Sequence, residues 1–334
     1  MHYRTLGQSG IEASVVALGT WAIGGWMWGG TDEKDSINAI HAAIDAGINF
    51  IDTAPIYGFG ASERILGRAI KDRRDQLILA TKCGMVCDPG VGEQKFRSSA
   101  LGVDSHGLID IHIYLGAKSI RDEVENSLKR LQTDYIDLLQ THWQEQTTPI
   151  EETMSTLMKL KDEGKIRAIG VCNASSQQMD EYRNFGTLDC DQEKFSMIDR
   201  QIEDDQLSFC RNHEMAVLAY SPLALGLLTG KMGPEREFAE GDLRHNNPRF
   251  SVDNRRVVAD MLREFEPIAA NHDLSLAQLT IAWTVAQPGL THALVGARNP
   301  QQAQENATAG DMQLPAEEVE HMNRIIARYN SEIA

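Results

Sequence analysis

The chain has 334 residues, a formal net charge of −16, 42% hydrophobic residues and 24% charged residues. This acidic balance argues against nucleic acid and anionic membranes as partners, because both attract clustered positive charge. The composition is that of a folded globular protein, and it contains neither an apolar run long enough to span a membrane nor a signal-peptide pattern, so we expect a cytoplasmic protein.

The chain opens with a predicted β-hairpin, HYRTL–GQSG–IEASV, whose glycine-containing turn joins two short strands. After the hairpin, short apolar segments alternate with segments of helical periodicity. The predicted strands are 15–19, 48–52, 77–82, 135–140, 166–171, 194–199, 216–220 and 291–296. The predicted helices are 33–46, 61–71, 119–131, 151–163, 175–184, 203–213, 300–309 and 315–331. Ser119 is expected to cap the third helix, and Pro315 to introduce the last one.

Eight strands that read as continuous apolar runs predict a parallel sheet covered by helices. This count is typical of a (β/α)8 TIM barrel, whereas a doubly wound sheet would show fewer strands and a glycine fingerprint near its first turn. Long polar or glycine-rich segments at 84–118 and 222–252 follow the third and seventh strands, and loops of this length are usually functional. Since no low-complexity linker interrupts the chain, we predict one domain over 1–334.

Four chemically active side chains fall at predicted strand ends. Asp52 closes the second strand and Tyr57 follows it, Lys82 closes the third, and His142 follows the fourth. Each alone has an ordinary reading: a cap for Asp52, packing for Tyr57, a surface charge for Lys82 and a core imidazole for His142. In a barrel, however, all four would meet at one rim.

Together, these groups suit proton transfer at a carbonyl oxygen. An ammonium favours the phenolate form of a tyrosine, a carboxylate keeps that ammonium charged and oriented, and an imidazole can position the carbonyl. Because no side chain supplies hydride, a nicotinamide cofactor is expected as the reductant.

Several segments, taken in order, resemble the aldo-keto reductase superfamily. They are LGTW (18–21), INFIDTAPIYGFGASERILGRAI (48–70), LATK (79–82), DYIDLLQTHW (134–143), GKIRAIGVCN (164–173), LAYSPLALGLLTGK (218–231) and VGARNPQQAQEN (295–306). WAIGGWMWGG (21–30) is further similar to a bacterial branch that includes general stress reductases. The resemblance implies a (β/α)8 barrel that reversibly reduces aldehydes or ketones with NADPH, without metal or flavin. We expect small polar or sugar-like carbonyl substrates.

The same resemblance implies roles for individual residues. Asp52, Tyr57, Lys82 and His142 match the catalytic tetrad, with Tyr57 as the general acid in reduction. The implied substrate contacts are Trp21, Trp28, Tyr57, His142 and Trp143. The implied cofactor contacts are Thr20, Trp21, Asp52, Cys172, Asn173, Gln192, Tyr220, Ser221, Leu223, Gly226, Leu227, Thr229, Lys231, Gly296, Arg298, Gln302, Glu305 and Asn306.

Within that cofactor set, Asn173 and Gln192 would hold the carboxamide, and Tyr220 would stack on the nicotinamide. Two features depart from the family pattern. Cys172 stands where a serine is common. Gly296 and Gln302 stand where many members place the lysine and arginine that clamp the 2′-phosphate, which leaves Arg298 as the obvious cation. We therefore expect NADPH preference, with NADH use left open.

Two other functions stay open at this point. One is a nicotinamide-binding regulatory subunit with little turnover, because the potassium-channel β-subunits resemble this superfamily. The other is a lyase in which Lys82 forms a Schiff base. The sequence leaves the oligomeric state and the exact substrate undetermined.

Overall fold

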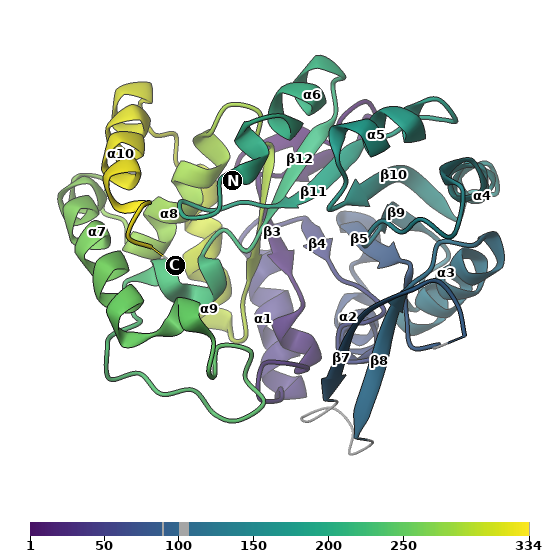
Figure 1. Ribbon diagram of the computed structural model, residues 1–334, viewed down its shortest axis with the longest axis horizontal. Coiled ribbons are helices and arrows are strands. Elements are labelled where there is room, and N and C mark those ends of the chain that lie inside the picture. Colours follow the sequence, from purple (N-terminus) through teal and green to yellow (C-terminus); the bar gives the residue numbers. More distant parts are fainter. Residues whose placement is uncertain (89, 100–106, 334) are drawn as a thin grey trace.

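Eight parallel strands close into a barrel in this computed structural model, which describes residues 1–88, 90–99 and 107–333. Around the barrel the strands follow the order β10-β11-β12-β13-β3-β4-β5-β9, so β13 pairs with β3 to close it. The strands are β3 (Val16–Gly19), β4 (Phe50–Asp52), β5 (Ile78–Cys83), β9 (Ile136–Thr141), β10 (Ile166–Cys172), β11 (Cys190–Lys194), β12 (Ala216–Tyr220) and β13 (His292–Gly296). The helices surround this barrel (Figure 1), and the predicted (β/α)8 fold is confirmed.

The helical layer contains every helix that the sequence predicts and two more. Its members are α1 (Glu33–Asp45), α2 (Ala61–Ile70), α3 (Ala117–Leu131), α4 (Ile150–Asp162), α5 (Ser176–Arg183), α6 (Gln206–Asn212), α7 (Val252–Asn271), α8 (Leu276–Ala286), α9 (Pro300–Thr308) and α10 (Ala316–Tyr329). The sequence analysis missed α7 and α8. Helix α8 is buried on nearly all sides, so its sequence lacks the polar face that reveals an amphipathic helix.

The N-terminal hairpin is confirmed, and it seals one end of the barrel. Strand β1 (Tyr3–Thr5) pairs antiparallel with β2 (Glu12–Ser14). Leu6, Ile11 and Ala13 of this hairpin pack in one buried cluster with side chains of the barrel interior, among them Phe50 and Leu218. The opposite end, where the strands finish, is therefore the end that can hold a site.

Two local predictions were wrong. The sixth strand is Cys190–Lys194 and not 194–199, so Gln192 lies within β11 instead of preceding it. The apolar run that suggested 194–199 supplies core side chains such as Phe195 and Met197 instead, after the strand has ended. Helix α3 begins at Ala117 without a side-chain cap, and Ser119 lies inside it.

Both long insertions are more structured than plain loops. The first, 84–118, contains β6 (Met85–Val86), β7 (Glu93–Ser99) and β8 (Leu108–Ile113), which form an antiparallel sheet beside the barrel (Figure 1). Residues 89 and 100–106 of this predicted loop lie outside the described residues. The second, 222–252, crosses to residues 21–30, the tryptophan-rich segment. There the backbone N–H of Leu243 donates to the carbonyl of Met27. Among the helices of the described residues, none is long and apolar enough to span a membrane.

Candidate active site

A buried ion pair lies at the ends of β4 and β5. The Lys82 ammonium donates to both carboxylate oxygens of Asp52, at 2.6 and 2.9 Å. It also donates to the carbonyl oxygen of Thr53 at 3.0 Å and to the hydroxyl oxygen of Tyr57 at 3.3 Å. Lys82 and Asp52 are only 1% and 2% exposed, so both charges depend on these contacts. The structure thus joins three of the four predicted catalytic residues through hydrogen bonds.

Two glutamines complete the surroundings of Asp52. The side-chain amides of Gln140 and Gln192 donate to its carboxylate at 3.3 and 3.2 Å, and the Gln192 amide also donates to Gln140. Gln192 was predicted as a cofactor contact, whereas the sequence analysis missed Gln140. Its position inside β9, directly before the predicted His142 segment, is a signal that could have revealed it.

The electrostatics of the cluster favour a protonated tyrosine. Burial raises the pKa of Tyr57 to about 12, and this effect outweighs the Lys82 charge, which alone lowers it. The Lys82 charge favours the phenolate, as expected from the sequence. Its effect is smaller than that of burial, so the net pKa of Tyr57 is raised. Burial lowers the pKa of Lys82, but the negative charge of Asp52 and neighbouring groups more than compensates, so Lys82 stays charged.

His142, the fourth predicted catalytic residue, contacts this cluster through Tyr57. Its ring meets the Tyr57 ring edge-on, with centroids 5.8 Å apart. Burial and the Lys82 charge together hold the pKa of His142 well below its ordinary value, so the imidazole is neutral. Its Nδ1 atom is buried without a hydrogen-bond partner among the described residues.

Tyr57 is positioned by a close approach of two backbone segments. A Cβ atom on Gly24 would stand 2.7 Å from the Tyr57 carbonyl carbon, and one on Gly58 would stand 2.1 Å from the Gly24 carbonyl oxygen. Gly58 also has a φ of 63°, which an L side chain rarely adopts. The segment that carries the tryptophans therefore fits against the Tyr57 segment only with glycine at both positions.

Gly24→Ala is therefore expected to displace Tyr57. We expect the free energy of unfolding to fall by about 1–3 kcal/mol and kcat to fall with it, because the added methyl group must push two backbones apart. Thermal melting and steady-state kinetics measure both effects. Gly233→Ala, where a Cβ meets nothing within 4 Å, is the matched control. Equal behaviour of the two variants would contradict this account of how Tyr57 is held.

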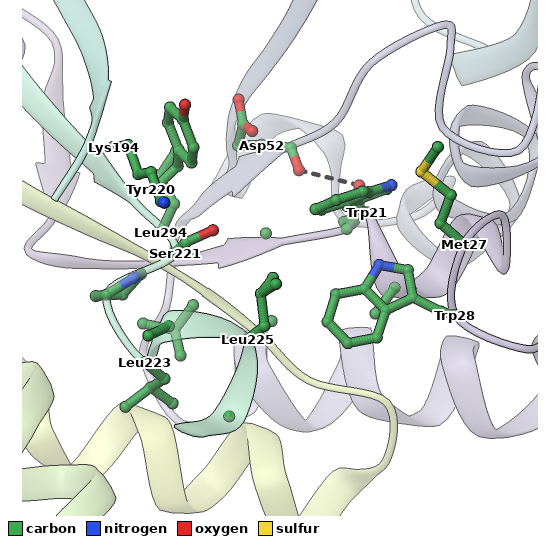
Figure 2. Close-up of a pocket in the computed structure, with 18 of the residues that line it drawn as sticks. Trp21, Met27, Trp28, Asp52, Lys194, Tyr220, Ser221, Leu223, Leu225 and Leu294 are labelled. Atoms are coloured by element: carbon green, nitrogen blue, oxygen red, sulfur yellow. Dashed lines mark hydrogen bonds between the residues drawn. The ribbon is translucent and has the colours of Figure 1, made fainter. Parts of the chain in front are cut away.

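A cavity of about 930 Å³ is lined by residues of this cluster and extends to the end of β13 and to α9. Figure 2 shows the part of it between Asp52, Tyr220, Trp21 and Trp28. Most predicted site residues line it: Thr20, Trp21, Trp28, Asp52, Tyr57, His142, Trp143, Asn173, Gln192, Tyr220, Ser221, Leu223, Gly226, Thr229, Lys231, Gly296, Arg298, Gln302, Glu305 and Asn306. Lys82 does not line the cavity but donates a hydrogen bond to Tyr57, which does. Cys172 and Leu227 are buried and do not line the cavity, although Cys172 lies close enough to Tyr57 and Lys82 for their charges to interact.

The cavity wall after β12 has an unusual backbone. Ser221, Ala224 and Leu225 have positive φ values of 56°, 45° and 57° without being glycine, and Gly226 follows at 93°. Such conformations cost about 1–3 kcal/mol each and persist mostly where a ligand site requires them. Figure 2 shows Ser221, Leu223 and Leu225 along this wall.

Asn173 and Tyr220 form a second fixed unit beside the cluster. The Tyr220 hydroxyl donates to the side-chain oxygen of Asn173 at 2.8 Å, and the Asn173 amide donates to the backbone carbonyl of His142 at 3.0 Å. Asn173 itself has a φ of 54°. Asn173 is therefore bonded to the backbone of the predicted catalytic histidine, and Tyr220 is connected to it through Asn173.

Cations gather along the cavity, although the whole chain is acidic. Lys231 pairs with Glu305 at 3.1 Å, and Arg298 donates to the backbone carbonyl of Gly30 at 2.7 Å. Arg244, from the second insertion, pairs with Asp242 and lies 5.1 Å from the ring centroid of Trp28. The sequence analysis missed Arg244, as well as Arg236 and Arg249, because no motif marks them inside the insertion.

The wall opposite Asn173 and Tyr220 is aromatic and apolar. Trp21 and Trp28 meet edge to face with ring centroids 5.5 Å apart, and Trp26 stacks on Phe96 of β7 at 6.2 Å. Met27, Ile56, Met85 and Trp143 also line this part of the cavity. Both the tryptophan-rich segment and the first insertion thus shape the space next to Tyr57.

Comparisons with known proteins agree with the fold. A family model for the aldo/keto reductase family matches residues 15–327. The chain is 42% identical to Aldo-keto reductase YhdN of Bacillus subtilis (strain 168), covering 98% of this chain and 94% of the relative. It is 41% identical to the NADH-specific methylglyoxal reductase of Escherichia coli (strain K12), covering 92% and 93%.

Among solved structures, the glycerol dehydrogenase AKR11B4 from Gluconobacter oxydans superposes with a TM-score of 0.84 at 40% identity, over 96% of this chain and 93% of that one. Within the described residues, no group of three or more His, Cys, Asp or Glu side chains is arranged to hold a metal ion. The chain belongs to the aldo/keto reductase family and is a nicotinamide-dependent oxidoreductase.

Proposed function

We propose that this protein reduces aldehydes or ketones to alcohols in the cytoplasm, with NADPH as its preferred cofactor and Tyr57 as the proton donor. The observation that carries the proposal is the connected set of Asp52, Lys82, Tyr57 and His142 at the floor of the cavity. A nicotinamide held in this cavity would supply hydride for the carbonyl carbon. The reaction is reversible, and in oxidation Tyr57 accepts the proton instead.

The side chains divide the proton chemistry between them. Tyr57 enters reduction protonated, because burial raises its pKa to about 12. The Lys82 ammonium then stabilises negative charge as it develops on the phenol oxygen, and Asp52 keeps that ammonium in place. Neutral His142 can donate one hydrogen bond to the carbonyl oxygen, which orients the carbonyl next to Tyr57.

The cavity fits a dinucleotide in size and in chemistry. Its volume of about 930 Å³ lies in the upper range of small-molecule sites. We assign the carboxamide to Asn173 and Gln192, the nicotinamide face to Tyr220, and the phosphates to the segment around Ser221–Gly226 with Lys231. Arg244 joins this set as a cation that the sequence analysis did not include.

Arg298→Ala tests the cofactor preference. Arg298 is exposed at the α9 end of the cavity, where a 2′-phosphate would lie. We expect the Kd for NADPH to rise about tenfold, because a charged hydrogen bond to phosphate is lost, and the Kd for NADH to change less than about twofold. Fluorescence titration measures both. Arg256→Ala, a surface arginine of α7, is the control. Equal weakening of both cofactors would contradict a 2′-phosphate role.

NADH is the second candidate cofactor. The Glu305 carboxylate lies in the same part of the cavity and repels a phosphate unless Lys231 neutralises it. A relative of 41% identity is named NADH-specific. A wild-type Kd for NADH equal to or below that for NADPH would support this candidate.

The substrate proposal is a small polar or sugar-like carbonyl compound. The aromatic wall of Trp21, Trp28 and Phe96 favours a second class, carbonyls with an aromatic or apolar substituent. Comparing kcat/KM for glyceraldehyde and benzaldehyde decides between them, and a higher value for benzaldehyde supports the second class.

A Schiff-base lyase is disfavoured by the state of Lys82. An amine must lose its proton to attack a carbonyl, whereas the Asp52 carboxylate keeps this amine charged and saturated with hydrogen bonds. Borohydride in the presence of an aldehyde is therefore expected to leave Lys82 unmodified, as mass spectrometry of the tryptic peptide can establish.

A further inference from the structure

Two carboxyl groups that the proposed chemistry does not use lie side by side behind the cofactor site. Asp191 and Glu193 are two residues apart on β11, so their side chains leave the same face of the strand. Gln192 between them points to the opposite face, into the cavity, where it donates to Asp52. The acid pair therefore lies on the helix side of the strand that carries Gln192.

Asp191 is fully buried, and Glu193 is 7% exposed. No donor among the described residues makes a hydrogen bond to either oxygen of Asp191, although the backbone N–H of Gln192 lies nearby. The Asp191 carboxyl lies within hydrogen-bonding reach of Glu193. A buried carboxylate without a donor is very costly, but a carboxylic acid that donates to a neighbouring carboxylate is not.

Among the described residues, no lysine, arginine or histidine side chain shifts the pKa of either carboxyl, so no cation there takes the place of this proton. Within the described residues, burial raises the pKa of the thiols of Cys172, Cys190 and Cys210 and of the phenol of Tyr220, and the charges of the acid pair raise these pKa values further. Burial, together with the charge of Glu193, raises the pKa of Asp191 well above its usual range, and burial also raises that of Glu193.

The pair is connected to the cofactor site through one hydrogen bond. Glu193 accepts the backbone N–H of Ala174 at 2.9 Å. Ala174 directly follows Asn173, whose left-handed backbone needs support and whose side chain contacts His142 and Tyr220. Glu193 therefore fixes the turn that presents Asn173 to the cavity.

We propose that Asp191 and Glu193 share one proton and act as positioning residues for the nicotinamide site, holding the Asn173–Ala174 turn in place. This inference rests on the proposed function, since it assigns Asn173 and Gln192 to the cofactor. When the shared proton is lost at alkaline pH, two adjacent carboxylates repel each other with no cation of the described residues to offset them, and the turn moves. Cofactor binding then weakens.

The sign of the pH effect follows from linkage. A carboxyl whose pKa is raised by folding contributes stability below its unfolded pKa of about 4, and this contribution is lost as the pH rises through its folded pKa. Melting temperature and NADPH affinity of the wild type should therefore both fall as the pH rises into the alkaline range, with the Kd rising about tenfold.

Asp191→Asn provides the test, because an amide keeps the donor to Glu193 but cannot lose a proton. We expect its NADPH affinity, measured by fluorescence titration, to lose the alkaline weakening that the wild type shows. Glu193→Gln also removes one carboxyl of the pair. Its NADPH affinity should likewise lose the weakening at alkaline pH. Asp204→Asn, an exposed carboxylate before α6, is the matched control and should keep the wild-type profile.

Infrared difference spectra of the cofactor-free protein supply an independent measurement. The wild type should show the C=O band of a buried protonated carboxyl at neutral pH, and Asp191→Asn should lack it. The proposal would be overturned if the wild type lacked this band, or if the NADPH affinity of both variants still weakened at alkaline pH. If NADPH binds at no pH, the proposed function fails, and the positioning role with it; the infrared band and the melting profile then decide only whether the proton is shared.

Discussion

Tyr57→Phe is expected to lower kcat for carbonyl reduction by about 10³-fold while the Kd for NADPH stays within about twofold of the wild type. The substitution removes only the hydroxyl that accepts a hydrogen bond from Lys82. The phenyl ring keeps its contacts with Trp21 and His142, so the cavity retains its shape. Steady-state kinetics and fluorescence titration measure the two quantities.

A large fall in kcat with an unchanged Kd for NADPH is what identifies a proton donor. A packing residue would change cofactor affinity or melting temperature together with kcat. Turnover within about tenfold of the wild type would show that another group delivers the proton, since a positioned general acid contributes at least about 10².

Lys82→Met is expected to cost about 3–5 kcal/mol of stability and to abolish turnover. Removing the ammonium leaves the Asp52 carboxylate buried, and its remaining hydrogen-bond donors among the described residues are the amides of Gln140 and Gln192. It also removes the charge that stabilises the Tyr57 oxygen. Denaturant unfolding gives the first effect, and kcat gives the second.

The double variant Asp52→Asn/Lys82→Met separates the two effects. With both charges gone, no buried ion lacks a partner, so most of the lost stability should return. Turnover should not return, because the ammonium is still missing. A double variant as unstable as Lys82→Met would mean that the methionine side chain, and not the uncompensated charge, causes the loss.

The sequence predicted best where one physical rule controls the position. Residues at the ends of parallel strands must meet at one rim, so Asp52, Lys82 and His142 could be expected to lie close together before any coordinate was known. The eight strands could be counted by a second rule, because a strand covered on both faces is a continuous apolar run.

Strand β11 shows where that rule fails. Its outward face carries Asp191 and Glu193 in place of aliphatic residues, so the apolar run appeared four residues too late, at 194–199. In the sequence, two acidic residues predict a polar loop even where both are buried in a strand. The same two residues that hid the strand are the ones that carry the further inference.

The cavity wall was harder to predict for a different reason. Arg244 reaches the cavity only because the second insertion crosses to the tryptophan-rich segment, where Leu243 donates to Met27. Phe96 reaches it only because 93–99 forms a strand beside the barrel. Contacts between distant segments of irregular chain follow no sequence period, so they become visible only in the fold.

Transfer of a labelled hydride tests the central claim most directly. The protein would be incubated with NADPH that carries deuterium at the transferable position of the nicotinamide, together with an aldehyde, and the alcohol would be analysed by mass spectrometry. The proposed function predicts one deuterium on the former carbonyl carbon with the wild type and almost none, in the same time, with Tyr57→Phe. An alcohol formed without deuterium, or no alcohol from any aldehyde or ketone despite bound NADPH, would contradict it.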